Sequence, residues 1–194
     1  MHKTKILTYI CVITFSILFF STGCKKKYTP KPRGYFRIDL PEKQYKDLTG
    51  DYPYTFKYPE YTRITQNKRK EEKYWINIEY PNLEGKIHIS YKKIEDNLDK
   101  ILDDTRKLAY KHTVKAEAIN EKVFLKPEKD VYGILYEIEG NAASSVQFFL
   151  TDSINHYLRG ALYFNCKPDK DSLSPVINFV KEDIIVLMES LEWK

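Results

Sequence analysis

Glycine and cysteine are scarce in this chain, and several familiar kinds of site are missing with them. Seven glycines and three cysteines are spread over 194 residues. No phosphate-binding glycine loop, paired-cysteine motif or HExxH segment occurs in the sequence. The stretch Asp169-Lys170-Asp171-Ser172 begins like a calcium loop, but it lacks the later glycine and the closing acid that such a loop requires. The sequence therefore predicts no metal site and no phosphate-binding loop.

A strong excess of one charge is also missing. The 32 basic and 27 acidic residues leave a formal net charge of +5. Grooves that bind nucleic acid need many cations concentrated on one face, and this excess is too mild for such a groove. We therefore expect no nucleic-acid partner.

The N-terminal apolar stretch is too short for a permanent membrane helix. It covers residues 6–20, is interrupted by Thr14 and Ser16, and falls below the roughly 20 apolar residues that spanning requires. Lysines precede it, and small residues at 21–23 lead to Cys24. This order of a basic, an apolar and a small-residue region predicts a cleaved export signal over residues 1–23.

Cys24 follows Gly23 directly, as in a bacterial lipobox, which predicts acylation of its thiol and of the amino group that cleavage creates. Each buried methylene of such chains contributes about 0.8 kcal/mol, so several chains together hold a protein firmly on a membrane. This covalent lipid is the only added group that we expect, with no cofactor. The lysines at 25–27 would lie among anionic headgroups, although a solvated charge run with no addressing role is the alternative.

The remaining cysteine, Cys166, has no cysteine partner once Cys11 leaves with the signal and Cys24 is acylated. In the alternation of residues 157–166 it falls on the face of Leu158 and Leu162. This pattern predicts a buried thiol that packs as a small hydrophobic side chain, with a reactive thiol as the alternative.

The sequence divides after the signal into a linker and one domain. Residues 24–51 are predicted to form a lipidated N-terminus and an extended linker, because prolines at 30, 32 and 41 and scattered charges interrupt any regular element. Within this linker, residues 34–41 are apolar enough that we expect them to lie along the domain or along a partner. Residues 52–194 are predicted to form a single α+β domain.

Most of this domain alternates apolar and polar residues with a period of two. Tyr74, Ile76 and Ile78 share one face of such a segment, and Ile87 and Ile89 share one face of the next, as in half-buried strands. His88 projects opposite to these isoleucines, which favours a hydrogen-bonded polar position over a metal ligand. The predicted strands are 54–58, 61–65, 74–80, 86–91, 116–125, 131–139, 146–151 and 157–165.

Helical spacing replaces this alternation at two places. The first helix is predicted to follow a cap at Asp96, and the second to start at Ser174-Pro175, with proline at its first position. The inner stripe of the first is predicted to be Leu98, Ile101, Leu102, Thr105, Leu108, Ala109 and His112. That of the second is predicted to be Val176, Val180, Ile184, Leu187, Met188 and Leu191.

This order of elements predicts an α+β fold. We expect a largely antiparallel sheet of about six to eight strands with two packed helices, because short turns join most neighbouring strands. The order of elements resembles the Mog1/PsbP-like fold, a binding scaffold in most of its members. In an antiparallel meander, Asp169 and the turn near Asp152 would lie at opposite ends of the sheet.

Two polar clusters invite a functional interpretation. Asp152, Ser153 and His156 combine the residue types of a nucleophilic site, but they also form one tight turn, where such residues bond the nearby backbone. The second cluster shares one strand face and consists of Tyr157, Arg159 and Tyr163. This pattern predicts either an outward-facing binding surface or sheet residues packed beneath a helix. Neither cluster requires catalysis, and we predict no enzyme.

The longer motifs of the mature chain are 32–41, 140–148, 151–153 and 159–164, together with Cys24, His156, Pro168, the stretch 171–173 and Pro175. They cover nearly the whole mature chain, and they resemble the gliding motility-associated lipoprotein family GldD of Bacteroidetes. Lipoproteins of that phylum sent to the cell surface resemble one another in carrying acidic residues after the cysteine, whereas lysines follow Cys24 here. We therefore expect the periplasmic face of the outer membrane.

The resemblance implies a periplasmic lipoprotein needed for gliding and for type IX secretion, acting beside other gliding lipoproteins and the outer-membrane ring. We therefore expect a non-catalytic accessory or assembly component. Two alternatives remain: an envelope hydrolase with Ser153 or Asp152 at the floor of a pocket, and a peptidoglycan binder with exposed tyrosines or Trp75 in a groove. The candidate partner contacts are Tyr35, Phe36, Arg37, Asp152, His156 and Arg159.

Overall fold

The computed structural model describes residues 38–66, 73–111 and 116–194. They belong to one compact unit, Tyr35–Lys194. The predictions for Cys24, Tyr35, Phe36, Arg37 and His112 lie outside the described residues. Among the helices in the described ranges, none is both long and apolar enough to span a membrane.

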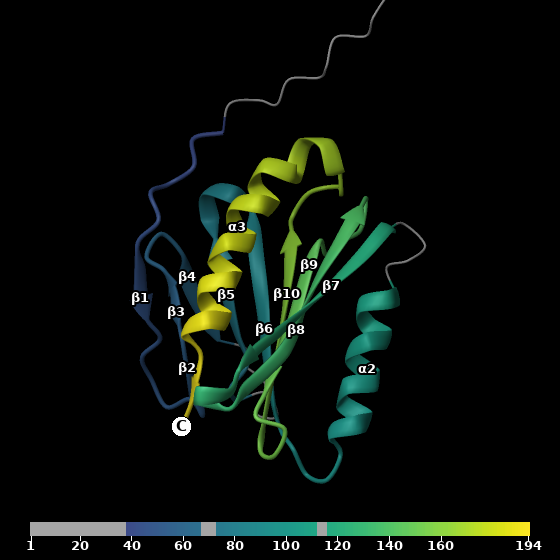
Figure 1. The fold of residues 1–194 in the computed structure, drawn as a ribbon. Helices are drawn as coiled ribbons and strands as arrows, with labels where there is room; N and C mark the ends of the chain where they lie inside the picture. Colours follow the sequence, from purple (N-terminus) through teal and green to yellow (C-terminus); the bar gives the residue numbers. More distant parts are fainter. Residues whose placement is uncertain (1–37, 67–72, 112–115) are drawn as a thin grey trace, which may run out of the picture. The chain divides into compact units, whose positions relative to one another are not determined.

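A seven-stranded antiparallel sheet forms the centre of the unit (Figure 1). Its strand order is β4-β5-β6-β10-β9-β8-β7, so β6 and β10, which are far apart in the sequence, pair along nine residues each. The fold is therefore α+β, as predicted. The strands are β4 (Arg63–Gln66), β5 (Ile76–Tyr80), β6 (Gly85–Lys93), β7 (Ala116–Lys126), β8 (Val131–Gly140), β9 (Val146–Thr151) and β10 (His156–Phe164).

One face of this sheet packs against α3 (Lys170–Ser190). All six residues of the inner stripe predicted for this helix are buried, with at most 6% of their surface exposed, although Leu191 lies just past the end of the helix. The helix starts four residues before the predicted Ser174, since the Asp169 carboxylate accepts the N–H groups of Asp171 and Ser172 and caps an earlier turn. Pro175 therefore lies inside the helix and not at its first position.

The opposite face packs against α2 (Leu98–Tyr110), so the two helices lie on different sides of the sheet. Ile101, Thr105 and Ala109 are buried there as predicted. Leu108, which was predicted for the same stripe, is 45% exposed because α2 covers only part of this face. The residue before the helix is Asn97 and not the predicted Asp96, whose positive φ of 51° lies outside the helical region.

Two small sheets lie beside the central sheet, and the second of them joins the C-terminal end of the unit to its N-terminal part. β1 (Tyr45–Asp47) pairs with β3 (Lys57–Pro59), and β2 (Tyr54–Thr55) pairs with the C-terminal β11 (Glu192–Trp193). Leu48 is 5% exposed and belongs to the core, against which Ile38 also packs. The folded unit therefore starts before residue 52, and part of the predicted linker lies along the domain.

The prediction of a buried Cys166 is wrong, because this thiol is exposed. β10 ends at Phe164, and residues 165 and 166 form a bend. The alternation of the strand does not continue through this bend, so its pattern no longer determines where the side chain points.

Candidate functional site

A groove lies beside α2, on the part of the sheet that this helix leaves uncovered. Side chains from β10, β6 and the segment that leads into β5 form its floor, and Leu108 and Asp104 of α2 form its wall. Its deeper part has a volume of about 280 Å³. A second, more open cavity shares Trp75, Lys92 and Asp104 with it and extends it toward the start of α2. We call this continuous feature the α2-side groove.

Arg159 lies on the floor of the α2-side groove, on β10 opposite Ser90 of β6 and Phe149 of β9. Its Nη2 donates a hydrogen bond of 2.5 Å to Oε1 of Gln147, whose side chain is buried at 1% exposure. Two buried nitrogen atoms beside this bond, Arg159 Nε and Gln147 Nε2, have no hydrogen-bond partner among the described residues. Arg159 and Gln147 thus keep two hydrogen-bond donors that no described acceptor satisfies.

The charges along the groove are predominantly positive. Five cationic and two acidic side chains line its two parts. Lys73 is 3.3 Å from Asp51, whereas Lys92, Lys100 and Arg159 form no ion pair with any residue in the described ranges. These cations favour an anionic ligand.

Two further rings lie along the groove floor. The indole N–H of Trp75 donates to the carbonyl of Tyr91 at 2.8 Å, which fixes its orientation. His88 Nδ1 is 2.5 Å from Oδ1 of Asn77, so His88 occupies the hydrogen-bonded polar position that was predicted. Burial first, and the charge of Lys86 second, lower the pKa of His88, although Glu79 opposes this shift. The lowered pKa favours the neutral ring.

The turn between β9 and β10 explains the Asp152, Ser153 and His156 cluster. Asp152 Oδ1 accepts the backbone N–H groups of Ile154, Asn155 and His156 at 3.0, 2.8 and 2.8 Å. Burial alone raises the pKa of this carboxyl, but the three N–H donors overcome that effect and hold the pKa below its ordinary value. Ser153 adopts a positive φ of 66° at the corner. Turn formation, one of the two interpretations of the sequence, is thus the role of Asp152.

His156 is bound on the other side of the sheet from Arg159. Its Nδ1 is 2.7 Å from the Tyr91 hydroxyl, and its ring stacks on Trp193 of β11 with centroids 5.2 Å apart. The predicted contacts Arg159 and His156 therefore do not form one site. Because the hydrogen bonds of Asp152 go to the backbone and that of His156 goes to Tyr91, the cluster lacks the linked acid and base of a catalytic triad.

Tyr157 does not face outward with Arg159, as one interpretation of the sequence required. It is 2% exposed beneath α2, and its hydroxyl bonds to the Thr105 hydroxyl of that helix. Burial raises its pKa to about 12 although the bond to Thr105 opposes this rise. The alternative of a tyrosine packed beneath a helix is therefore confirmed for Tyr157, while Tyr163 is half-buried.

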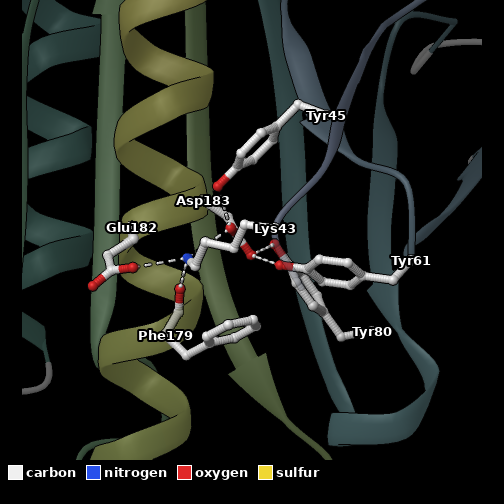
Figure 2. Close-up of polar contacts among 7 residues, drawn as sticks. All are labelled: Lys43, Tyr45, Tyr61, Tyr80, Phe179, Glu182 and Asp183. Atoms are coloured by element: carbon white, nitrogen blue, oxygen red, sulfur yellow. Dashed lines mark hydrogen bonds and ion pairs between the residues drawn. The ribbon is translucent and has the colours of Figure 1, made fainter. Parts of the chain in front are cut away.

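Sequence reasoning missed a buried carboxylate on α3, Asp183, which Figure 2 shows at the centre of a polar network. Asp183 is 1% exposed. Lys43 donates to its Oδ1 at 2.9 Å and Tyr45 donates to the same oxygen at 2.8 Å. Tyr61 donates to Oδ2 at 2.6 Å, and Tyr80 at 3.3 Å. Four donors from three separate segments thus surround one carboxylate.

This network attaches the N-terminal segment to α3. Lys43 also donates to the backbone carbonyl of Phe179 at 2.8 Å and lies 3.0 Å from Glu182. Burial first, and hydrogen bonding to Asp183 second, raise the pKa values of Tyr45 and Tyr61. The only sequence signal is that residue 183 falls on the inner stripe of a helix, and the donors that satisfy it are not visible in the sequence.

Comparison with known proteins gives one extensive match. The family described as gliding motility lipoprotein GldD matches residues 25–193. No curated protein matches the chain significantly. Among solved structures, the solution structure of cyanobacterial PsbP (CyanoP) from Synechocystis sp. PCC 6803 is similar, with 11% identity and a TM-score of 0.48, over 84% of this chain and 100% of that one.

The sequence identity to that structure is low. The family match instead extends from the residue after Cys24 to the penultimate residue, and it agrees with the resemblance found in the sequence. The chain belongs to the gliding motility lipoprotein family GldD.

Proposed function

We propose that this lipoprotein is anchored through acylated Cys24 in the outer membrane, faces the periplasm, and acts as a non-catalytic accessory component of gliding motility and type IX secretion. Membership of the gliding motility lipoprotein family supports the role in gliding. The lipobox at Cys24 and the lysines that follow it support the anchor and its orientation. Other gliding lipoproteins and the outer-membrane ring of the secretion machinery are the proposed partners.

The α2-side groove is the surface that we assign to partner binding, and it is the observation that carries this proposal. It combines Trp75 with Arg159, two residue types that dominate binding energy at protein interfaces. Leu108 adds an exposed apolar side chain at its rim. A surface with aromatic, apolar and cationic side chains side by side suits a protein partner better than it suits bulk water.

The other predicted contacts keep secondary roles in this proposal. Tyr35, Phe36 and Arg37 would contact a partner beside the anchor. His156 lines a shallow depression with Trp193 and Lys129, which would form a smaller contact on the opposite side of the sheet. Asp152 would act only indirectly, by holding the turn that carries His156.

Photo-crosslinking in native envelopes tests this proposal. A photoreactive residue at Leu108, on the groove rim, should capture one or a few envelope proteins, while the same residue at Val123 should capture few. Val123 is a matched control because it is 70% exposed and lies on β7, away from the groove. Equal capture from both positions, or none from Leu108, would remove the groove from the proposed function.

Peptidoglycan binding is the second candidate, and Trp75 in the groove is the observation that favours it. Co-sedimentation of the purified lipoprotein with isolated cell wall measures it directly. Loss of co-sedimentation in Trp75→Ala but not in Trp193→Ala would support glycan binding in the α2-side groove. No co-sedimentation by the unaltered protein would exclude this candidate.

A further inference from the structure

The α2-side groove contains positive charge and hydrogen-bond donors that the described residues leave unmatched. Arg159 is half-buried, and one of its nitrogen atoms, Nε, is buried without a partner. The neighbouring Gln147 has the same deficit at Nε2. A buried donor without an acceptor destabilises a fold, and more so when the group is charged. Because these two atoms are buried, a ligand in the groove meets the rest of the Arg159 guanidinium, which has donors only, so the ligand must bring acceptors.

Two lysines extend this field along the groove. Lys92 of β6 pairs with Tyr157 across the ladder, next to the Arg159 pair on the same face. Lys100 projects from the first turn of α2 into the open part of the groove. Neither of them forms an ion pair within the described ranges.

Acidic groups also face the groove and limit the charge that a ligand needs to bring. Asp104 of α2 lines both parts, and Glu95 lines the open part. Neither is within ion-pairing distance of Arg159. Cationic side chains therefore still outnumber acidic ones around the deeper part of the groove. This modest surplus is complementary to a ligand with a few carboxylates and not to a highly charged polyanion.

We infer that the α2-side groove binds an acidic segment of a partner protein, with one carboxylate against Arg159 and others near Lys92 and Lys100. An arginine fork matches the planar geometry of a carboxylate. Apolar side chains at Trp75 and Leu108 border the same space, so the segment would carry aromatic or aliphatic residues between its acids. This inference rests on the proposed function and specifies the chemistry of the partner.

Carbodiimide crosslinking tests this chemistry because the reagent joins a lysine amine to a carboxylate without a spacer. Native envelopes are treated, and peptides crosslinked to the lipoprotein are identified by mass spectrometry. We expect Lys92 or Lys100 to be joined to an aspartate or glutamate of another protein. Lys86 and Glu79, on the same sheet face at 3.6 Å from each other, should give an internal product that verifies access of the reagent.

Substitution of the central arginine provides the second arm. Arg159→Gln should lower the yield of the Lys92 product about tenfold, which corresponds to the loss of one charged hydrogen-bonded pair of roughly 1.4 kcal/mol. Arg159→Lys should restore part of the yield. Arg63→Gln is the matched control, because Arg63 lies on β4 of the same sheet and already contacts Glu79 at 3.2 Å, so its yield should equal that of the unaltered protein.

Each outcome separates this inference from the proposed function. If Leu108 captures a protein by photo-crosslinking while Lys92 and Lys100 give no carbodiimide product, the groove binds a partner and the acidic chemistry is wrong. A product between Lys92 and a peptidoglycan carboxylate would also overturn it, in favour of a glycan. Absence of both kinds of product, with the Lys86 product present, would reject the groove altogether.

Discussion

Replacement of Asp183 should weaken the domain more than replacement of any exposed acid. Asp183→Ala removes the only carboxylate that accepts from Lys43, Tyr45 and Tyr61 together, and it leaves their polar groups in a largely buried space. Removal of one partner from a buried charged pair costs about 3–5 kcal/mol. Lys43 is 25% exposed and can turn toward water, which favours the lower end of that range.

Two further variants separate the effects of charge and geometry. Asp183→Asn keeps one acceptor oxygen but loses the charge, and charged hydrogen bonds are roughly twice as strong as neutral ones, so a loss of about 2 kcal/mol is expected. Glu182→Gln is the matched control, because Glu182 also contacts Lys43 but is 65% exposed. An exposed pair of this kind contributes about 0–1 kcal/mol.

Urea unfolding followed by tryptophan fluorescence, with the mature lipoprotein in detergent, measures these three differences. Trypsin cleavage at Lys43 and Lys46 under native conditions gives a local readout, because the network attaches that segment to α3. Asp183→Asn should accelerate this cleavage, and Glu182→Gln should leave it nearly unchanged. Equal stability of Asp183→Asn and Glu182→Gln would refute the reasoning.

The same network predicts a loss of stability at alkaline pH. The pKa values of Tyr45, Tyr61 and Tyr80 are raised above the ordinary value of 10.0 in the folded chain. Because the unfolded chain loses these protons first, the stability contributed by the neutral phenols is complete below pH 10 and falls as the pH rises through the folded-state values. Tyr61→Phe should flatten this alkaline decline in urea midpoints measured between pH 9 and 11.

Three other changes test the turn, the sheet and the thiol. Asp152→Ala should lower the free energy of unfolding by about 1 kcal/mol at pH 7. Because folding lowers the pKa of Asp152, this difference in stability from the unaltered protein should shrink as acidification protonates the carboxylate. Thermal melts at several pH values measure the difference, and one that stays constant with pH would count against the turn assignment. Gly133→Ala would set a methyl carbon 2.0 Å from the Phe149 carbonyl oxygen, so β8 and β9 must separate, and urea unfolding should register about 3 kcal/mol. Cys166 should react fully with a maleimide in the folded protein without a shift in melting temperature, because its side chain is exposed; slow labelling would show that the thiol is covered.

The strands and helices were largely predictable because they follow from periodicity. Alternating residues predicted every strand of the seven-stranded sheet to within a few residues, and the six-residue stripe of α3 is buried as expected. The turn at Asp152 was also readable, since a short acidic side chain bonds the backbone within its own loop. These features depend on contacts between residues that are close in the sequence.

The lipobox at Cys24 and the segments shared with the family were likewise available from the sequence, and family membership follows from them. Contacts between residues that are distant along the chain could not be predicted from the sequence. Lys43 and Asp183 are 140 residues apart. The α2-side groove likewise forms only because β10 pairs with β6 while α2 leaves that part of the sheet uncovered. The role of a carboxylate on an apolar helix stripe, such as Asp183, can be identified only when the fold shows which hydrogen-bond donors surround it. Local patterns thus determined the elements and predicted the anchor, whereas strand order and helix placement alone decided which polar groups were buried together and which remained exposed in the α2-side groove.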